Sequence, residues 1–157
     1  MKPRRLHIVL ATALLVGAAT VRASSLPVIQ GGVSGVELCA QSMCGSAIFV
    51  ALFNGQIGGN PNALGLISVS IKHEDLPPAG VSSKINSGVW QLQSLGRPIA
   101  GIVTGGTILN TNGDGTFQIL VHMQITSPGA SGLLSFVGEL SHNVFPPSIK
   151  GHIIQQP

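Results

Sequence analysis

Apolar and polar residues alternate along most of the chain, and this period of two predicts β-strands. The first strong strand covers residues 46–57, where the odd-numbered and the even-numbered positions are both largely apolar. Two apolar faces are typical of a strand that is buried on both sides or that contacts a partner. Further strands are predicted at residues 64–72, 81–85, 88–95, 99–109, 116–125, 133–140 and 149–155.

Turn-forming residues separate the predicted strands. Loops are expected at residues 58–62 and 73–80, and shorter turns at residues 96–98 and 127–130. The most specific signal is residues 110–115, where Asn-Gly and Asp-Gly pairs join two apolar runs, because these residues tolerate positive φ. A last hairpin is expected around residues 143–147, and no segment after residue 23 has the period of an amphipathic helix.

The number and spacing of the strands predict an all-β domain. Seven or eight strands with short connections favour antiparallel pairing in sequence order. We therefore expect a small antiparallel up-and-down barrel, with a β-sandwich as the alternative. Glycines within the strands suit the bends and bulges of a tightly curved sheet. These glycines are Gly101, Gly105, Gly106, Gly138 and Gly151.

Residues 1–23 have the order of a cleavable secretory signal peptide. A basic start precedes an apolar run at residues 6–21, and the small Ala23 precedes the expected cleavage point. The run is shorter than the ~20 residues that cross a bilayer as a helix, so a retained anchor is the less favoured alternative. We expect a signal-peptide helix and export to a periplasm or the extracellular space.

The rest of the chain, residues 24–157, is expected to form one domain. In this interpretation an N-terminal segment at residues 24–45 precedes the antiparallel β domain at residues 46–157. Its length is enough to bury a core without the help of metals. No stretch after residue 23 approaches a transmembrane helix. An outer-membrane barrel is disfavoured, because the chain has no Tyr and only one Trp to form aromatic girdles.

Loss of the signal peptide changes the charge of the chain. The full sequence has eight Lys and Arg residues against five Asp and Glu residues, but four of the basic residues lie within residues 1–22. The exported chain would keep four basic and five acidic residues. A nucleic-acid partner requires a basic patch that neutralises phosphates, and this balance supplies none. The sequence therefore excludes nucleic acid as the expected partner.

The cysteines and histidines are the candidates for specific chemistry. Cys39 and Cys44 are predicted to form a disulfide, since export leads to an oxidising compartment, and a redox role is disfavoured because four residues separate them. The histidines lack the close spacing of metal ligands, so separate roles are the simplest interpretation. The alternative is a metal site that brings His122 near His142 or His152.

The sequence contains no motif for nucleophilic catalysis and no phosphate-binding loop, so we predict no catalytic residue and no cofactor. Low charge and apolar strands favour an exported, non-enzymatic protein that acts by binding or self-association. The alternatives are a carrier of a small hydrophobic ligand inside the barrel and an enzyme with a His-centred site. If a cavity exists, aromatic residues should line it, and otherwise they form the core. They are Phe49, Phe53, Trp90, Phe117 and Phe136.

Overall fold

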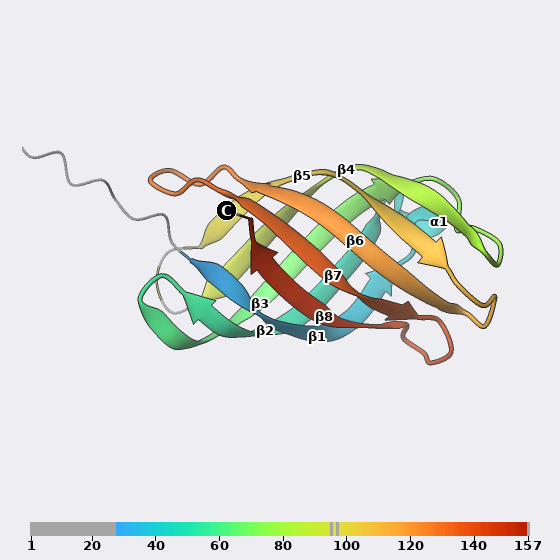
Figure 1. The fold of residues 1–157 in the computed structure, drawn as a ribbon, viewed down its shortest axis with the longest axis horizontal. Helices are drawn as coiled ribbons and strands as arrows, with labels where there is room; N and C mark the ends of the chain where they lie inside the picture. Colours follow the sequence, from blue (N-terminus) through green and yellow to red (C-terminus); the bar gives the residue numbers. More distant parts are fainter. Residues whose placement is uncertain (1–27, 95, 97, 157) are drawn as a thin grey trace, which may run out of the picture.

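The computed structural model describes residues 28–94, 96 and 98–156, and it shows a closed barrel of eight antiparallel strands (Figure 1). A short helix follows the first strand. The elements are β1 (Ile29–Cys39), α1 (Gln41–Cys44), β2 (Ala47–Ile57), β3 (Asn60–His73), β4 (Val81–Ser94), β5 (Ile99–Asn110), β6 (Thr116–Ile125), β7 (Leu133–Ser141) and β8 (Ser148–Gln155). The predicted all-β barrel is confirmed, and the alternative sandwich is not formed.

Each strand pairs with its neighbour in the sequence, and the pairing of β8 with β1 closes the barrel. In this closing pair, Gly31 lies opposite Ile153 and Val36 lies opposite Ser148. Closure leaves no free sheet edge, so the backbone of the first and the last strand is hydrogen-bonded on both sides. The register places odd-numbered residues of β1 and β2 inside the barrel.

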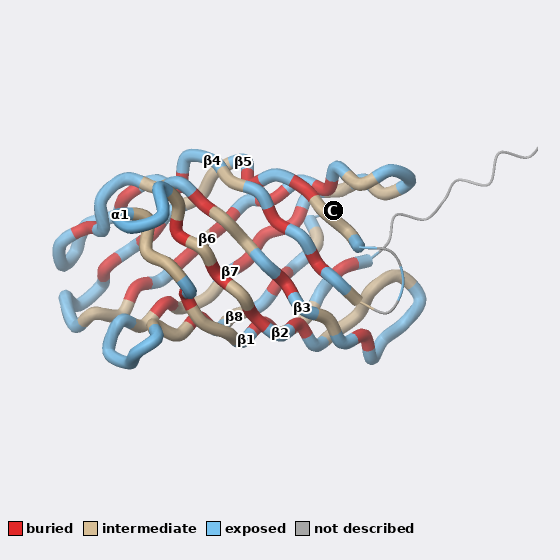
Figure 2. The backbone as a smooth tube through the Cα atoms, turned by 180° about the vertical axis from the view of Figure 1, so that it is seen from behind, coloured by how far each residue is buried: buried red, intermediate tan, exposed pale blue. Residues whose placement is uncertain are grey.

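Burial alternates along the strands, as Figure 2 shows by the change between buried and exposed segments. On β6, for example, Phe117, Ile119 and Val121 are buried, whereas Gln118 and His122 are exposed. The inward positions carry an almost wholly apolar core, and burial of this surface is the main driving force for folding. The sequence pattern therefore determines which side of each strand forms the interior.

Inward glycines allow the strands to approach one another closely inside the barrel. A Cβ atom on Gly138 would overlap the Phe136 ring and the carbonyl oxygen of Lys150. At Gly101, an added Cβ would lie 2.7 Å from Nε1 of Trp90, because the indole covers this glycine. These strand glycines therefore make room for aromatic rings in a narrow interior.

The structure differs from the sequence prediction in three places. It adds β1, which the pattern does not predict because Gly31, Gly32 and Gly35 interrupt the run of side chains. Residues 81–94 form one strand rather than two, and its register against β3 shifts between Ser87 and Ile85. Asn60 begins β3 instead of lying in a loop, so the preceding turn is tighter than expected.

The predicted signal peptide lies outside the described residues. Within residues 28–156, apart from positions 95 and 97, no helix has the length and apolar character needed to cross a membrane. The one helix in that part, α1, has four residues and is capped by Gly45, which adopts a left-handed conformation with φ of 71°.

Candidate functional site

One end of the barrel holds a pocket of about 380 Å³, which we call the end pocket. It lies where β1, β3, β5 and β7 end, beneath the loops that follow them. Apolar side chains from the barrel interior and polar side chains from the strand ends share its wall. The lining residues are Glu37, Ala40, Gln41, Ser42, Phe49, Ile71, His73, Asp75, Leu76, Ile108, Ile119, Leu140 and His142.

Glu37 is the unusual member of this wall. It occupies an inward position near the end of β1, opposite Phe49 of β2, and its side chain is only 6 % exposed. Its backbone N–H donates to the carbonyl oxygen of Pro147 at 2.8 Å, which fixes this part of β1 against the loop before β8. The carboxylate therefore lies on the inward face, where most of the strands place apolar side chains and where β4 and β5 place the buried polar residues Ser83 and Asn110.

His142 is the neighbour of this carboxylate. Its Nε2 lies 3.2 Å from Oε2 of Glu37, and its ring also makes an edge contact with Phe117. Even so, Oε2 of Glu37 is buried and accepts no hydrogen bond from any described residue. The imidazole and the carboxylate are thus close enough to form an ion pair, but their geometry is not that of a hydrogen bond.

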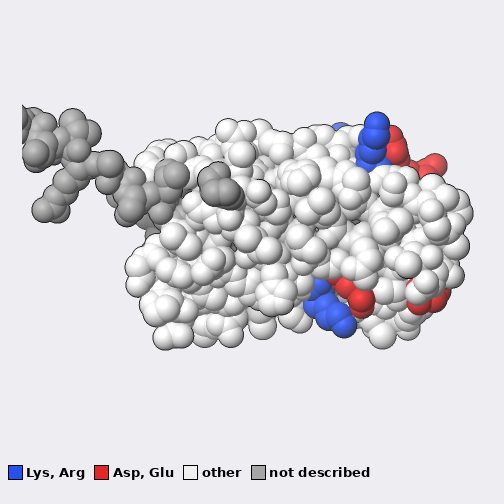
Figure 3. All heavy atoms as spheres, in the orientation of Figure 1, with Lys and Arg blue, Asp and Glu red and all other residues white. Residues whose placement is uncertain are grey.

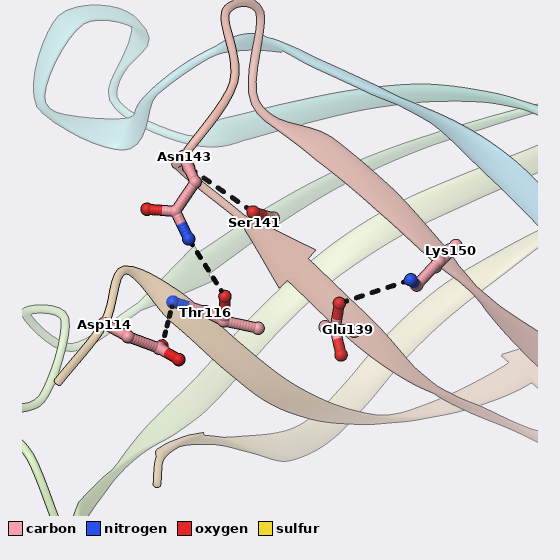
Figure 4. A network of polar contacts seen from close by, with 6 residues as sticks. All are labelled: Asp114, Thr116, Glu139, Ser141, Asn143 and Lys150. Atoms are coloured by element: carbon pink, nitrogen blue, oxygen red, sulfur yellow. Dashed lines mark hydrogen bonds and ion pairs between the residues drawn. The ribbon is translucent and has the colours of Figure 1, made fainter. Parts of the chain in front are cut away.

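Hydrogen bonds between two loops hold His142 in place. Its backbone N–H donates to the carbonyl oxygen of Gly115 at 2.9 Å. In the same region the Asn143 side chain donates to the Thr116 hydroxyl at 3.2 Å, and Thr116 N–H donates to Asp114 at 2.9 Å (Figure 4). The turn before β6 and the turn after β7 are thus joined, and this fixes the histidine at the pocket wall.

The helix α1 forms the opposite part of the pocket wall. Cys39 and Cys44 form the predicted disulfide, with Cα atoms 6.1 Å apart, so the expectation is confirmed. The Gln41 side chain accepts from the backbone N–H of His73 and donates to its carbonyl oxygen, each at 2.7 Å. The disulfide and this paired contact hold α1 against the end of β3.

Charged residues gather at the same end of the molecule. Every Lys, Asp and Glu in the described part of the chain lies in the half of the barrel that holds the end pocket. Figure 3 shows this on one face, where the charged side chains occupy the right half and the left half has none. The group contains five acidic side chains against three lysines, so this half is net acidic.

The middle of the barrel is nearly filled. A cavity of about 40 Å³ remains there, far smaller than the ~300–1,000 Å³ of most ligand sites. All five aromatic residues predicted to line a cavity are buried in the core, and two of them, Phe49 and Phe136, line this small space. Phe49, Ile71 and Ile119 also line the end pocket, so they separate it from the interior.

The histidines of the hypothesised metal site have separate positions. His142 lies at the end pocket, whereas His122 and His152 lie on the outer face of β6 and β8. Nδ1 of His122 lies 3.4 Å from the Ser135 hydroxyl. In the described part of the chain, no group of three or more His, Cys, Asp or Glu residues is arranged to hold a metal ion.

Sequence reasoning identified His142 but missed Glu37, Gln41 and Asp75 as residues of one site. A usable signal was present at Glu37, because it continues the alternation of Ile29 and Val33 on the inward face of β1. A single carboxylate on an apolar face is unusual and marks a candidate site. The signal was not recognised because the glycines of β1 interrupt its alternating pattern, so that no strand was predicted there.

The comparisons with known proteins give no further identification. No protein-family model, no curated protein and no solved structure matches this chain. The functional argument therefore rests on the geometry of the end pocket.

Proposed function

We propose that the protein is an exported binding protein that takes a small ligand in the end pocket. The observation that carries this proposal is the buried carboxylate of Glu37, whose Oε2 accepts no hydrogen bond in the pocket wall. A volume of about 380 Å³ falls within the range of small-molecule sites, and an apolar wall with few polar groups is typical of them. The disulfide agrees with export to an oxidising compartment.

The energetics of Glu37 favour a binding role over a structural one. A buried polar atom without a hydrogen bond costs ~1–3 kcal/mol, of which the ion pair of Oε2 with His142 at 3.2 Å offsets a part, and an apolar residue at this position would avoid that cost. Gln41, by contrast, has both of its side-chain groups hydrogen-bonded and serves to position α1. A ligand that donates to the carboxylate would remove the cost, and this is the function we infer for Glu37.

A carrier of a hydrophobic chain is the second candidate. It is supported by the shared wall of Phe49, Ile71 and Ile119, since movement of these side chains would join the end pocket to the inner cavity. Organic extraction of protein purified from the exporting cells, followed by mass spectrometry, tests it. A recovered lipid supports the carrier, and a clean extract counts against it.

Self-association is supported by a different surface. Leu52 and Leu66 lie opposite each other on the outside of β2 and β3, and with Leu64 they form an exposed apolar group. Light scattering over a range of protein concentrations tests this candidate. A mass that rises with concentration and falls on Leu52→Lys supports it, whereas a constant monomer mass contradicts it.

Nuclear magnetic resonance with a neutral probe tests ligand binding at the end pocket. We expect hexan-1-ol to shift the backbone signals of Gln41, Ser42 and His73. Ser42→Trp should abolish these shifts, because an indole on α1 would occupy the pocket. Asn62→Trp is the matched control, since Asn62 is an exposed position of β3 far from the pocket lining.

The proposal fails if hexan-1-ol at millimolar concentration leaves all three signals unchanged. It also fails if Ser42→Trp and Asn62→Trp reduce the shifts equally, because the effect would then not depend on the pocket. A catalytic role for His142 is a separate alternative, and it requires a turnover activity that His142→Ala abolishes.

A further inference from the structure

We infer that the ligand of the end pocket is an organic cation, specifically a primary amine with a short apolar body. This inference rests on the proposed binding function and adds the chemical class of the ligand. It follows from three features of the pocket, namely its charged groups, the state of Glu37 and the character of its floor.

The charged groups of the pocket wall favour a cation over an anion. Glu37 and Asp75 contribute two carboxylates. The other titratable side chains of the wall are His73 and His142, and none of the lining residues is a lysine or an arginine. Among the three described lysines, Lys150 lies 3.5 Å from Glu139 on the outside of the barrel and does not line the pocket. A bound carboxylate would therefore face two like charges, whereas an ammonium would be attracted by both.

Because Oε2 of Glu37 accepts no hydrogen bond, we expect the ligand to carry a hydrogen-bond donor. A primary ammonium carries three N–H donors and no acceptor, so it can serve a carboxylate without leaving a polar atom of its own unmatched. In the ligand-free protein Nε2 of His142 lies near Oε2 without donating to it. Because Oε2 is itself buried, the ammonium would have to displace this imidazole, and it would then form a charge-assisted hydrogen bond to the carboxylate.

The apolar floor of the pocket favours a ligand whose body is apolar. Phe49, Ile71 and Leu140 present hydrocarbon surface beside the carboxylate. Next to lining residues in the sequence, Met43 of α1 is 82 % exposed, and Phe145 in the loop that carries His142 is 97 % exposed. Hydrocarbon attached to the ammonium would cover apolar surface that now contacts water.

Calorimetric titration with three ligands of equal chain length tests the class. The probes are hexylamine, hexan-1-ol and hexanoate, which share a hydrocarbon body and differ in the charge of the head group. We expect hexylamine to bind at least about tenfold more tightly than hexan-1-ol, as one charge-assisted hydrogen bond predicts. Hexanoate should bind more weakly than the alcohol.

Two variants and one control test whether the preference for hexylamine over hexan-1-ol depends on the pocket carboxylates. Glu37→Gln keeps the shape of the side chain and should remove the preference for hexylamine over hexan-1-ol. Glu139→Gln removes the same charge at the same end but outside the pocket lining, so the preference should remain. Asp75→Asn, in an exposed loop, provides a second test if Glu37→Gln does not fold, and it should reduce the preference.

The outcomes separate the ligand class from the binding function. Equal binding of hexylamine and hexan-1-ol, with shifts at Gln41 and Ser42, overturns the cation and leaves the pocket as a ligand site. A preference for hexylamine that Glu139→Gln removes and Glu37→Gln retains also overturns the inference, because the amine would then bind elsewhere. Absence of binding by all three probes rejects the proposed function itself.

Discussion

The two ends of the barrel are built from the same kind of strand, but their interiors are filled in different ways. At the end where β1 and β7 begin, Ile29, Leu92 and Leu134 are almost completely buried. At the end where the same strands finish, the inward positions are Glu37 and Leu140, and a pocket borders the core side chains. We call these the filled end and the open end.

The hydrogen bonding of the polar groups also differs between the two ends. At the filled end Gln155 accepts from the N–H of Ile29 at 2.9 Å, and the buried atom without a hydrogen bond among the described residues of that half is the indole Nε1 of Trp90, which is uncharged. At the open end the buried carboxylate of Glu37 keeps an oxygen without a donor. The comparison teaches that stability is concentrated where the packing is complete, and that binding capacity lies where a buried charge and a pocket interrupt it.

The largest expected difference is in the cost of removing a leucine. Leu134→Ala at the filled end should lower the free energy of unfolding by about 3–4 kcal/mol, because it leaves a cavity among packed neighbours. Leu140→Ala on the same strand should cost about 2 kcal/mol, because it already borders open space. Urea unfolding of both variants measures the difference, and equal costs would show that the two ends are equally packed.

Removal of the disulfide is expected to have the next largest effect on the free energy of unfolding. Removing the bond with Cys39→Ser and Cys44→Ser should lower the free energy of unfolding by about 2 kcal/mol, as the entropy of a short loop predicts. It should also weaken probe binding, because the bond holds α1 at the pocket wall. Urea unfolding and hexan-1-ol titration of the double variant test this. Unchanged binding would separate α1 from the site.

A substitution at Glu37 is expected to change the free energy of unfolding by a smaller amount and in the opposite direction. Glu37→Gln should raise the free energy of unfolding by about 1 kcal/mol, because it removes a buried charge whose Oε2 lacks a hydrogen bond. Glu139→Gln is the control and should change stability by less than about 0.5 kcal/mol. Thermal or urea unfolding compares them. A loss of stability in Glu37→Gln would indicate that the carboxylate is structural.

The smallest effect is expected in the fluorescence of Trp90, the only tryptophan of the chain. Its ring is buried over Gly101 and lines neither the end pocket nor the inner cavity. Saturating hexan-1-ol should therefore leave the emission maximum unchanged. A shift would mean that the ligand enters the packed interior, which is the result that a carrier of an apolar chain requires.

The sequence predicted most of the barrel because local patterns decide which residues form strands. Residues 116–125 were predicted with the bounds that the structure shows, since alternation is strong and turn residues flank it. The strand β1 was missed because its glycines have no side chains to reveal the pattern. Those glycines are required by close approach to β2, as at Gly35, and this depends on the neighbouring strand rather than on the local sequence.

The site was less predictable than the fold. Glu37 and His142 meet because β8 closes on β1, and no local pattern records a contact between positions so far apart in the sequence. The aromatic residues were identified as core or cavity residues, but the pattern does not give the volume that they leave unfilled. That volume depends on how all eight inner faces fit together, so the position of the pocket required the structure.

The pairing of β1 with β8 also has a consequence for synthesis of the chain. Until the eight residues Ser148–Gln155 have left the ribosome, β1 and β7 each have an edge without a hydrogen-bonded neighbour. Such edges pair readily with other chains, and contacts between distant segments form slowly. The nascent protein is therefore exposed to aggregation until β8 has paired with β1 and β7, and this strand determines whether the barrel closes.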